Sequence, residues 1–264
     1  MADRRLAVIT GASSGLGAEF AKQLAERNYD VWLIARRLDK LEGLAAELSA
    51  KHGVRAEAMR ADLVDPADLE RVAERIAGAE SLDLLVNNAG FGTMGRFFDT
   101  GLAGQMTMHQ LHVLATVRLA HAALPGLVRR RRGGIINVSS VAGFVVMPSN
   151  ISYCATKAWM NRFTYGMRLE LQAAGSPVRV QALCPGFTYT EFHDTLGMSR
   201  DPIPKSLWMS AEFVVRESLD GLERGTLYVI PGWRYKLLVA FLRAVPDRLL
   251  EAGARRFGLR RRRR

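Results

Sequence analysis

The sequence predicts an α/β fold in which one doubly wound parallel sheet is covered by helices on both faces. Apolar runs rich in β-branched residues recur along the chain, and longer stretches with helical periodicity separate them. Strands that alternate with helices in this way pair in parallel, and the helices then cover both faces of the sheet. With 264 residues and 48% hydrophobic content, the chain can bury one large core.

The expected strands are short and regularly spaced along the first 230 residues. No internal repeat or low-complexity linker interrupts them, so we expect a single domain over residues 1–232. In chain order, the runs that predict strands are LAVIT (6–10), VWLIA (31–35), the weaker VRAEAM (54–59), LDLLV (82–86), GIINVS (134–139), VRVQAL (178–183) and TLYVI (226–230).

Two segments depart from this alternation. Residues 186–208 hold two prolines and mixed polarity, which predicts a long loop with one short helix, and such loops often act as lids. Residues 233–264 form a C-terminal extension with a basic tail, in which Pro246 ends one short amphipathic helix and starts another. This extension is too interrupted to cross a bilayer.

The net charge of +11 is concentrated in two arginine runs, Arg129–Arg132 and Arg260–Arg264. These runs supply nine positive charges, so the rest of the chain carries 11 − 9 = +2. This distribution predicts a solvated helix end and a disordered tail, and no specific nucleic-acid partner. Contact of the tail with nucleic acid or anionic lipid stays open as the alternative.

The cysteine content predicts a reducing compartment. Cys154 and Cys184 are the two cysteines, and nothing in their number resembles a disulfide scaffold. The first ten residues, MADRRLAVIT, carry charges and only a short apolar run, unlike a secretory signal or a membrane span. We therefore expect a cytoplasmic protein, with peripheral membrane contact through the C-terminal extension as a further possibility.

A glycine-rich turn follows the first predicted strand. The sequence TGASSGLGAEF places Gly11, Gly15 and Gly17 where a strand gives way to an amphipathic helix. Glycines let the backbone approach the pyrophosphate of a dinucleotide, and the free N–H groups and helix dipole favour its charge. The spacing differs from G-x-G-x-x-G, so a purely structural turn is the alternative interpretation.

The end of the second predicted strand favours NADP(H) over NAD(H). Folds that select NAD place an acid near this point to bind the ribose hydroxyls. Here Ala35 stands in place of that acid, and Arg36 and Arg37 follow it with positive charges. A guanidinium can hold a 2′-phosphate through charge-assisted hydrogen bonds, whereas a carboxylate would repel it. Solvated arginines at the start of a helix are the alternative.

The sequence SYCATK offers an acid–base pair. On a helix, Tyr153 and Lys157 lie four residues apart on one face, while Cys154 is turned about 100° away. An adjacent ammonium is expected to lower the pKa of a phenol from about 10, so that it can exchange a proton. Cys154 is expected to be a small buried helix residue. Tyrosine–lysine pairs at this spacing are common on helices, so the pair is weak by itself.

Other motifs give the pair its weight. Ser140 ends the strand GIINVSS thirteen residues before Tyr153, and LLVNNAG ends another strand at residues 84–90. Together with the glycine turn, they stand in the order and spacing of the short-chain dehydrogenase/reductase family, which the chain resembles over about residues 5–230. The resemblance implies a Rossmann-type sheet and an NADP(H)-dependent reaction on a carbonyl or alcohol.

The resemblance also implies roles for individual residues. Ser140 would orient the carbonyl, Tyr153 would act as general acid or base, and Lys157 would tune Tyr153 and bind the nicotinamide ribose. The remaining residues would surround the cofactor, from its phosphates through the adenosine to the nicotinamide: Gly11, Ser13, Ser14, Gly15, Leu16, Gly17, Arg36, Arg37, Asp62, Leu63, Asn88, Ala89, Gly90, Pro185, Gly186 and Thr188.

One position departs from the family pattern. The family has an asparagine in the helix after NNAG, where it helps hold a water that links the lysine to solvent, and His112 stands in the matching place here. Histidine also forms hydrogen bonds, but it is bulkier and titrates near neutral pH. His112 is expected to serve the proton relay or its support, with a purely structural role as the alternative.

The expected activity is reduction of a carbonyl on a lipophilic substrate with NADPH, or oxidation of the matching alcohol. A cofactor-binding regulatory or scaffold protein is the alternative, and no histidine spacing predicts a metal site. The resemblance implies a homodimer or homotetramer paired through helices at 102–131 and 152–174. Apolar residues that could line the substrate site are Phe91, Met94, Phe97, Phe144, Val145, Val146, Met147, Phe187, Phe192, Met198, Leu207 and Trp208.

Overall fold

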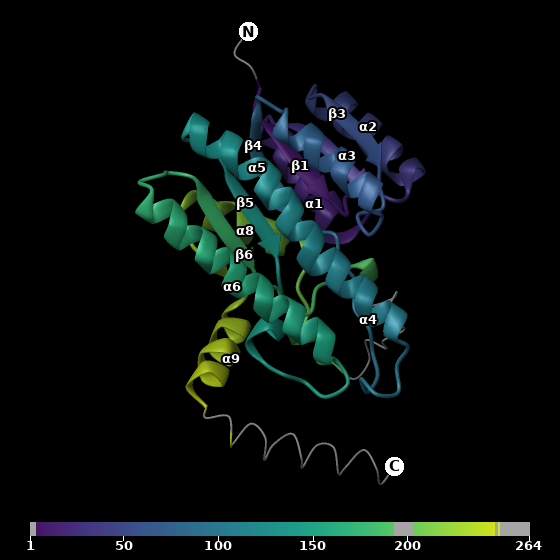
Figure 1. The fold of residues 1–264 in the computed structure, drawn as a ribbon, viewed down its shortest axis with the longest axis vertical. Helices are drawn as coiled ribbons and strands as arrows, with labels where there is room; N and C mark the ends of the chain where they lie inside the picture. The colour runs from purple at the N-terminus through teal and green to yellow at the C-terminus, as the bar shows by residue number, and fades with distance from the viewer. Residues whose placement is uncertain (1–3, 193–202, 246–247, 249–264) are drawn as a thin grey trace.

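The structure, a computed structural model, describes residues 4–192, 203–245 and 248. Its strands form one parallel sheet in the order β3-β2-β1-β4-β5-β6-β7, which confirms the predicted doubly wound, Rossmann-type fold (Figure 1). The strands are β1 (Leu6–Thr10), β2 (Asp30–Ala35), β3 (Ala56–Arg60), β4 (Leu82–Asn87), β5 (Gly134–Val138), β6 (Arg179–Leu183) and β7 (Tyr228–Val229).

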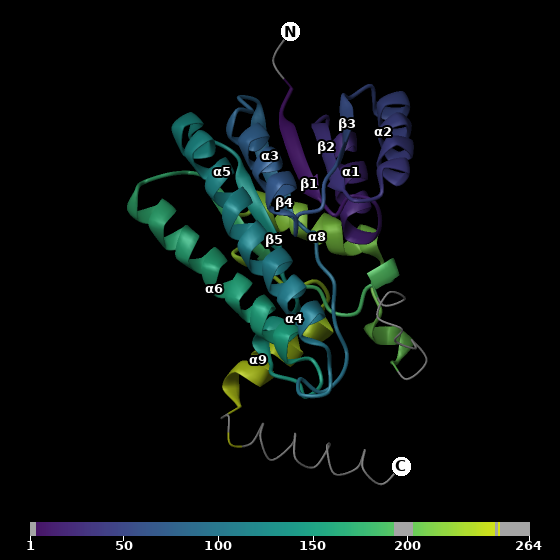
Figure 2. The ribbon, with the colours of Figure 1, turned by 45° about the vertical axis from the view of Figure 1, so that its right-hand side comes forward.

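Helices cover both faces of the sheet (Figures 1 and 2). One layer holds α1 (Gly15–Glu26), α2 (Leu38–His52) and α8 (Ala211–Glu223). The other holds α3 (Pro66–Ala77), α4 (Leu102–His109), the π-helical η1 (Gln110–Ala115), α5 (Thr116–Arg130) and α6 (Ile151–Ala173). Two short 3-10 helices, η2 (Val141–Phe144) and η3 (Lys205–Leu207), and the C-terminal α9 (Trp233–Ala244) complete the described elements.

Strand alternation divides the core between the two layers. In β1, Ala7 and Ile9 pack with the α1, α2 and α8 layer, whereas Leu6 and Val8 pack with the α3, α5 and α6 layer. Successive side chains of a strand point to opposite faces, so a run that is apolar at every position becomes buried on both sides. The central strands β1, β4 and β5 are accordingly mostly apolar and are buried at every position, and the few polar residues buried with them are Thr10, Asp83, Asn87 and Asn137.

The continuous helix Leu102–Arg130 is the one helix in the described part of the chain that is long and apolar enough by composition to cross a membrane. Its most apolar window has a mean hydropathy of 1.4, and 44% of that window is buried in the protein. The buried face packs on β4 and α3, with Leu119 and Leu127 fully enclosed. Packing within the core accounts for this apolar character.

Two predicted features are shorter in the structure than in the sequence pattern. The last strand keeps only two residues, because β7 pairs with β6 alone at the edge of the sheet. In the described part of the segment 186–208, residues 191 and 192 are helical and the three-residue η3 lies near the end. Residues 193–202, which include Met198, lie outside the described part, as do the second C-terminal helix expected after Pro246 and the run Arg260–Arg264.

The carboxyl ends of the strands gather the predicted site residues at one edge of the sheet. Parallel strands all end at the same edge, and ligands bind there at the point where the strand order reverses. In this sheet the reversal lies between β1 and β4, whose ends lead into the glycine turn and into Asn88. The following strands deliver Ser140 and Pro185 to the same edge.

Candidate active site

The glycine turn after β1 needs glycine at two positions. Gly11 has a φ of +67°, and a Cβ on it would lie 2.9 Å from the Cα of Ala89. A Cβ on Gly17 would lie 2.2 Å from the carbonyl oxygen of Gly11. The turn therefore brings backbone close to backbone at the start of α1, where unpaired N–H groups favour an anion, and its shape fits a pyrophosphate.

Thr10 joins the glycine turn to the NNAG segment, a role that the sequence analysis missed. Its Oγ1 accepts hydrogen bonds from the N–H groups of Asn88 (2.9 Å) and Ala89 (3.0 Å). The Asn88 side chain donates to the carbonyl oxygens of Thr10 (2.9 Å) and Gly11 (3.3 Å). These hydrogen bonds from Asn88 hold the glycine turn against the NNAG segment. The only signal in the sequence was a buried hydroxyl residue at a strand end.

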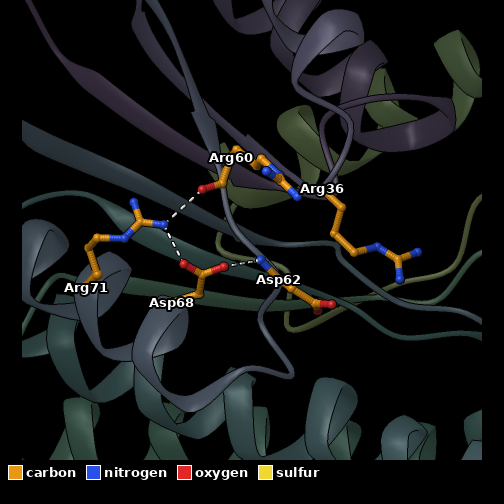
Figure 3. Close-up of a pocket in the computed structure, with 5 residues that line it drawn as sticks. All are labelled: Arg36, Arg60, Asp62, Asp68 and Arg71. Carbon is orange, nitrogen blue, oxygen red and sulfur yellow. Dashed lines mark hydrogen bonds and ion pairs between the residues drawn. The ribbon is translucent and has the colours of Figure 1, made fainter.

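A pocket of about 380 Å³ opens beside the ends of β2 and β3 (Figure 3). Arg36 and Asp62, both predicted site residues, lie on the same side of it, opposite Arg71. Arg60 and Asp68 complete the lining, and neither these two residues nor Arg71 were predicted. The register explains Arg60, because it pairs with Ala35 at the end of the neighbouring strand and so lies beside Arg36.

A hydrogen-bond chain fixes the acidic side of this pocket. Asp68 accepts from the backbone N–H of Asp62 at 2.8 Å and from Arg71 at 2.6 Å. Both hydrogen bonds lower the pKa of Asp68, and the bond from the Asp62 N–H has the larger effect. The Asp62 carboxylate accepts from Val64 N–H at 3.1 Å, while Leu63 between them is buried. These hydrogen bonds hold Asp62 at the edge of the pocket.

Arg37 lies apart from this pocket and is engaged within the chain. Its Nε donates to Ser13 Oγ at 3.2 Å, and its Nη2 donates to Ser14 Oγ at 2.9 Å. The same Nη2 forms an ion pair with Glu191 at 3.1 Å. Arg37 thus links the glycine turn to the segment after β6. Among the described residues, Arg36 and Arg60 form no ion pair, so they remain available to an anion in the pocket.

Ser140, Tyr153 and Lys157 come together between β5 and the first turns of α6. Ser140 caps η2, accepting from Ala142 N–H at 3.1 Å, and its hydroxyl lies 3.5 Å from the Pro185 carbonyl oxygen. Lys157 donates to the Val138 carbonyl oxygen at 2.7 Å, and its Nζ lies 5.6 Å from the centre of the Tyr153 ring. Tyr153 and Lys157 therefore lie on one face of α6, as their spacing predicted.

The electrostatics of the pair differ from the expectation. Burial raises the pKa of Tyr153 to about 12, and a side-chain hydrogen bond with Ser140 opposes the rise. The predicted lowering by Lys157 was wrong for this structure, because the buried ammonium faces the Val138 carbonyl and burial dominates. Burial also lowers the pKa of Lys157 to about 8.

His112 is buried within η1, and both of its ring nitrogens have partners. Phe91 N–H donates to Nε2 at 3.1 Å, so Nδ1 carries the proton and meets Thr156 Oγ1 at 3.0 Å. The Thr156 hydroxyl in turn donates to the Tyr153 carbonyl oxygen at 3.0 Å. Burial, and next the charge of Lys157, hold the pKa of His112 well below its usual range. The imidazole is thus a neutral bridge between η1 and the helix that carries Tyr153.

The loop after β6 is held by a residue from the far end of the chain. Tyr235 of α9 is buried against Gly186, where a Cβ would lie 2.0 Å from its Cζ. Its hydroxyl accepts from Phe187 N–H at 3.0 Å and donates to the Leu207 carbonyl oxygen at 2.7 Å. Thr188 donates to the Gly186 carbonyl oxygen at 3.0 Å. No pattern in the sequence linked Tyr235 to this loop.

The apolar residues predicted for the substrate site divide into three groups. Phe192 lies over the active centre, its ring centre 5.9 Å from that of Tyr153. A second group packs within the protein, at Phe91 against His112, Phe144 against Tyr228, and Phe187 against Trp208, with Val145 and Leu207 half-buried. The third group is exposed: Met94, Phe97, Val146 and Met147.

The two cysteines are free, buried thiols. Burial raises the pKa of Cys154, and it raises that of Cys184 to about 12. Both thiols are therefore protonated at neutral pH, which makes them poor nucleophiles. The Cys184 thiol lies 3.4 Å from the Oδ1 atom of Asn161.

Comparison with known proteins places this geometry in a family. Residues 5–200 match the family described as short chain dehydrogenase. An uncharacterized oxidoreductase of Myxococcus xanthus is 33% identical over 96% of this chain and 97% of its own length. A very-long-chain 3-oxoacyl-CoA reductase of Anas platyrhynchos is 30% identical over 88% of this chain and 75% of its own length.

Among solved structures, a short-chain dehydrogenase from Sphingobium yanoikuyae in complex with NADPH superposes with a TM-score of 0.82. It is 35% identical, and the match covers 97% of this chain and 94% of that one. Sequence, sheet order and site geometry therefore agree. The chain belongs to the short-chain dehydrogenase/reductase family, whose members are oxidoreductases that act on alcohol or carbonyl groups with a nicotinamide dinucleotide.

Proposed function

We propose that the protein reduces a carbonyl group on a lipophilic substrate with NADPH. The observation that carries this proposal is the group of Ser140, Tyr153 and Lys157 at the carboxyl edge of the sheet, in which Ser140 and Lys157 are buried and Tyr153 is half-buried. Two neighbouring hydroxyl groups can both donate hydrogen bonds to a carbonyl oxygen placed between them. A cation behind the pair favours negative charge on that oxygen.

The preference for NADP(H) rests on the pocket at the ends of β2 and β3. Arg36 and Arg60 line it, and Ala35 offers no carboxylate that would repel a 2′-phosphate. Two guanidinium groups without an ion pair among the described residues can meet the two charges of such a phosphate. The NADPH complex of the Sphingobium yanoikuyae relative agrees with this preference.

Each polar residue then has a distinct role. When bound, the nicotinamide supplies the hydride that reaches the carbonyl carbon. Tyr153 gives its phenolic proton to the carbonyl oxygen, and Ser140 donates a hydrogen bond to the same oxygen. A pKa of about 12 keeps Tyr153 protonated at neutral pH, which suits an acid in the reductive direction. In the oxidative direction Tyr153 takes the proton back.

His112 is a positioning residue in this proposal. Its bridge runs from Phe91 N–H through the imidazole and Thr156 to the Tyr153 carbonyl oxygen, so it fixes the first turn of α6. Both ring nitrogens are used in the bridge, which leaves the imidazole no group for a relay water. His112 therefore takes the place of the family asparagine as a support for Tyr153, and it does not take part in proton transfer.

The lipophilic substrate is inferred from the surroundings of Tyr153. The ring of Phe192 packs against the ring of Tyr153, and the ring of Phe91 packs edge-on against His112. Aromatic walls around a few polar groups favour a long-chain acyl, steroid-like or aromatic ketone over a sugar. The name of the Anas platyrhynchos relative, a very-long-chain 3-oxoacyl-CoA reductase, is compatible with a substrate of this kind.

A substrate screen tests the proposal. Purified protein is mixed with NADPH and a panel of ketones, aldehydes and 3-oxoacyl thioesters, and the loss of nicotinamide absorbance is followed. We expect turnover with bulky apolar carbonyls and little with sugars. Tight NADPH binding without turnover across the panel would instead favour a regulatory or scaffold protein. That alternative rests on His112, which stands in place of the family asparagine.

Assembly and compartment complete the proposal. Exposed apolar side chains on η1, α5 and α6, namely Leu114, Val117, Tyr165 and Leu169, support pairing through these helices in a homodimer or homotetramer. The free buried thiols fit a reducing cytoplasm. A monomeric mass at micromolar concentration in light scattering would contradict the first inference.

A further inference from the structure

Helix α9 turns an apolar face away from the protein. Trp233, Leu237 and Phe241 are 63%, 61% and 65% exposed, and they lie four residues apart, on one side of the helix. The opposite side carries Tyr235 and Val239, which are buried. The helix is therefore docked by one face, and its other face meets no part of the described chain.

Two other segments expose apolar side chains at the same end of the molecule. Figures 1 and 2 show α9, the start of α6 and the start of α4 gathered there. The loop before α4 is joined to the loop before α6 by a hydrogen bond of 3.0 Å from Gly95 N–H to the Ser149 carbonyl oxygen. The exposed apolar residues of these two loops and helix starts are Met94, Phe97, Phe98, Leu102, Val146, Met147 and Ile151.

This apolar end lies next to the elements that carry the catalytic residues. Ile151 opens α6 two residues before Tyr153, and α9 packs on η2, which follows Ser140. The exposed side chains of 94–102, 146–151 and 233–241, here called the apolar rim, thus border the approach to the catalytic residues. Isolated exposed leucines are ordinary on proteins, but a contiguous apolar area of this kind marks an interaction surface.

The charges on and beside the rim are almost all positive. The rim itself carries Arg96, Arg234 and Lys236 and a single acid, Asp99, whose carboxylate pairs with Arg96, and Arg243 follows in the last turn of α9. Arg234, Lys236 and Arg243 stand exposed along α9 beside its apolar face. Aromatic and aliphatic side chains flanked by cations are the pattern of a helix that lies in the interface of an anionic bilayer.

We propose that the apolar rim docks on the surface of a bilayer that contains anionic lipid, and that the substrate enters the active site from that bilayer. A second copy of the chain seated on the rim would cover the entrance and would set like charges against one another. A bilayer instead meets the cations with its headgroups and the apolar side chains with its acyl region. The docking stands alone, whereas the route of entry rests on the proposed function.

Vesicle cosedimentation of the full chain tests the docking. The protein is spun with phosphatidylcholine vesicles that contain or lack phosphatidylserine, without cofactor or substrate. We expect binding to the anionic vesicles that weakens as salt is raised. Leu237→Glu with Phe241→Glu should reduce the partition coefficient at least about tenfold, because two apolar side chains leave the interface. Leu38→Glu, at an exposed leucine of α2, is the matched control and should bind like the wild type.

Three outcomes would overturn the docking. The first is the absence of binding to anionic vesicles at low salt, and the second is unchanged binding by the double variant. The third is a wild type that does not bind vesicles, combined with a double variant whose oligomer mass is lower than that of the wild type. The last outcome would assign the rim to contacts between copies of the chain. Because the assay needs no turnover, a protein that binds vesicles but reduces no carbonyl would contradict the proposed function and leave the docking intact.

Discussion

The ring of Tyr235 occupies the space beside Gly186, so that a Cβ on Gly186 would lie 2.0 Å from the Tyr235 Cζ. Through the same side chain, the C-terminal helix holds the loop that follows β6. The hydroxyl bonds Phe187 N–H and the Leu207 carbonyl oxygen, which belong to segments twenty residues apart. The loop that would border the nicotinamide is therefore shaped by a helix outside the motifs of the family.

Tyr235→Phe should lower kcat/KM by about tenfold to a hundredfold. The change keeps the ring against Gly186 but leaves two buried backbone groups without their partner, at a cost of about 1–3 kcal/mol. The loss should show as a raised KM for NADPH, measured with thermal unfolding in parallel. Trp233→Phe, at an exposed position of the same helix, is the control and should change neither value. An unchanged KM in Tyr235→Phe would contradict the positioning role.

Arg36 and Arg37 should respond differently to removal. Arg36 lines the pocket beside Arg60, so Arg36→Ala should weaken NADPH binding by about 1.5–3 kcal/mol and leave NADH binding nearly unchanged. Arg37 holds Ser13 and Ser14 of the glycine turn, so Arg37→Ala should weaken both dinucleotides. Titration of each variant with both cofactors by fluorescence measures the difference. Equal losses of NADPH and NADH in Arg36→Ala would exclude a 2′-phosphate contact.

Tyr153→Phe should abolish turnover and leave NADPH affinity within about twofold of wild type, because only the proton-donating oxygen is lost. Cys154→Ala serves as the neighbouring control. That thiol is buried with a raised pKa, so its loss should change kcat little. Stopped-flow kinetics with saturating NADPH would show both results. Substantial turnover in Tyr153→Phe would mean that another group supplies the proton.

His112 should leave no trace in the pH dependence of the reaction. Its pKa lies well below the usual range because the ring is buried, so the imidazole stays neutral as the pH falls through 6.5. A profile of kcat/KM from pH 5 to 9 should therefore show no inflection near 6.5. His112→Ala should reduce kcat by about tenfold or more through loss of the bridge to Thr156. His112→Asn can keep one of the two bonds and should lose less.

The sheet was predictable because its signal is local. Each strand is a short apolar run, and both the glycine turn and the tyrosine–lysine pair lie within one turn or one helix, where spacing alone sets the geometry. For the same reason, the expected helices at 102–131 and 152–174 agree with the observed Leu102–Arg130 and Ile151–Ala173 to within one residue at each end.

The rest of the site depends on contacts between distant segments. Arg60 lies beside Arg36 because two strands pair in register, and Tyr235 reaches Gly186 across 49 positions of sequence. The direction of the Tyr153 pKa was also beyond the sequence, since it depends on burial and on Lys157 facing Val138. Spacing predicts which residues share a helix face, but not what covers them.

Lys157 is a buried cation that costs the fold stability at neutral pH. Burial lowers its pKa from 10.5 to about 8, so the folded protein releases the proton more readily than the unfolded chain. Below pH 8 both states are protonated and the full cost is present. Between about pH 8 and 10.5 the unfolded chain binds more protons, so the stability of the wild type rises with pH in that range.

Lys157→Met should therefore be inactive and yet more stable at pH 7, by about 1–2 kcal/mol in urea unfolding. Methionine removes the buried charge, while the lost bond to the Val138 carbonyl offsets part of the gain. The advantage over the wild type should shrink from pH 7 to pH 9.5, because the wild-type lysine is then neutral in the folded state. An advantage that grew with pH, or a variant less stable at pH 7, would show that the ammonium is better solvated than its burial implies.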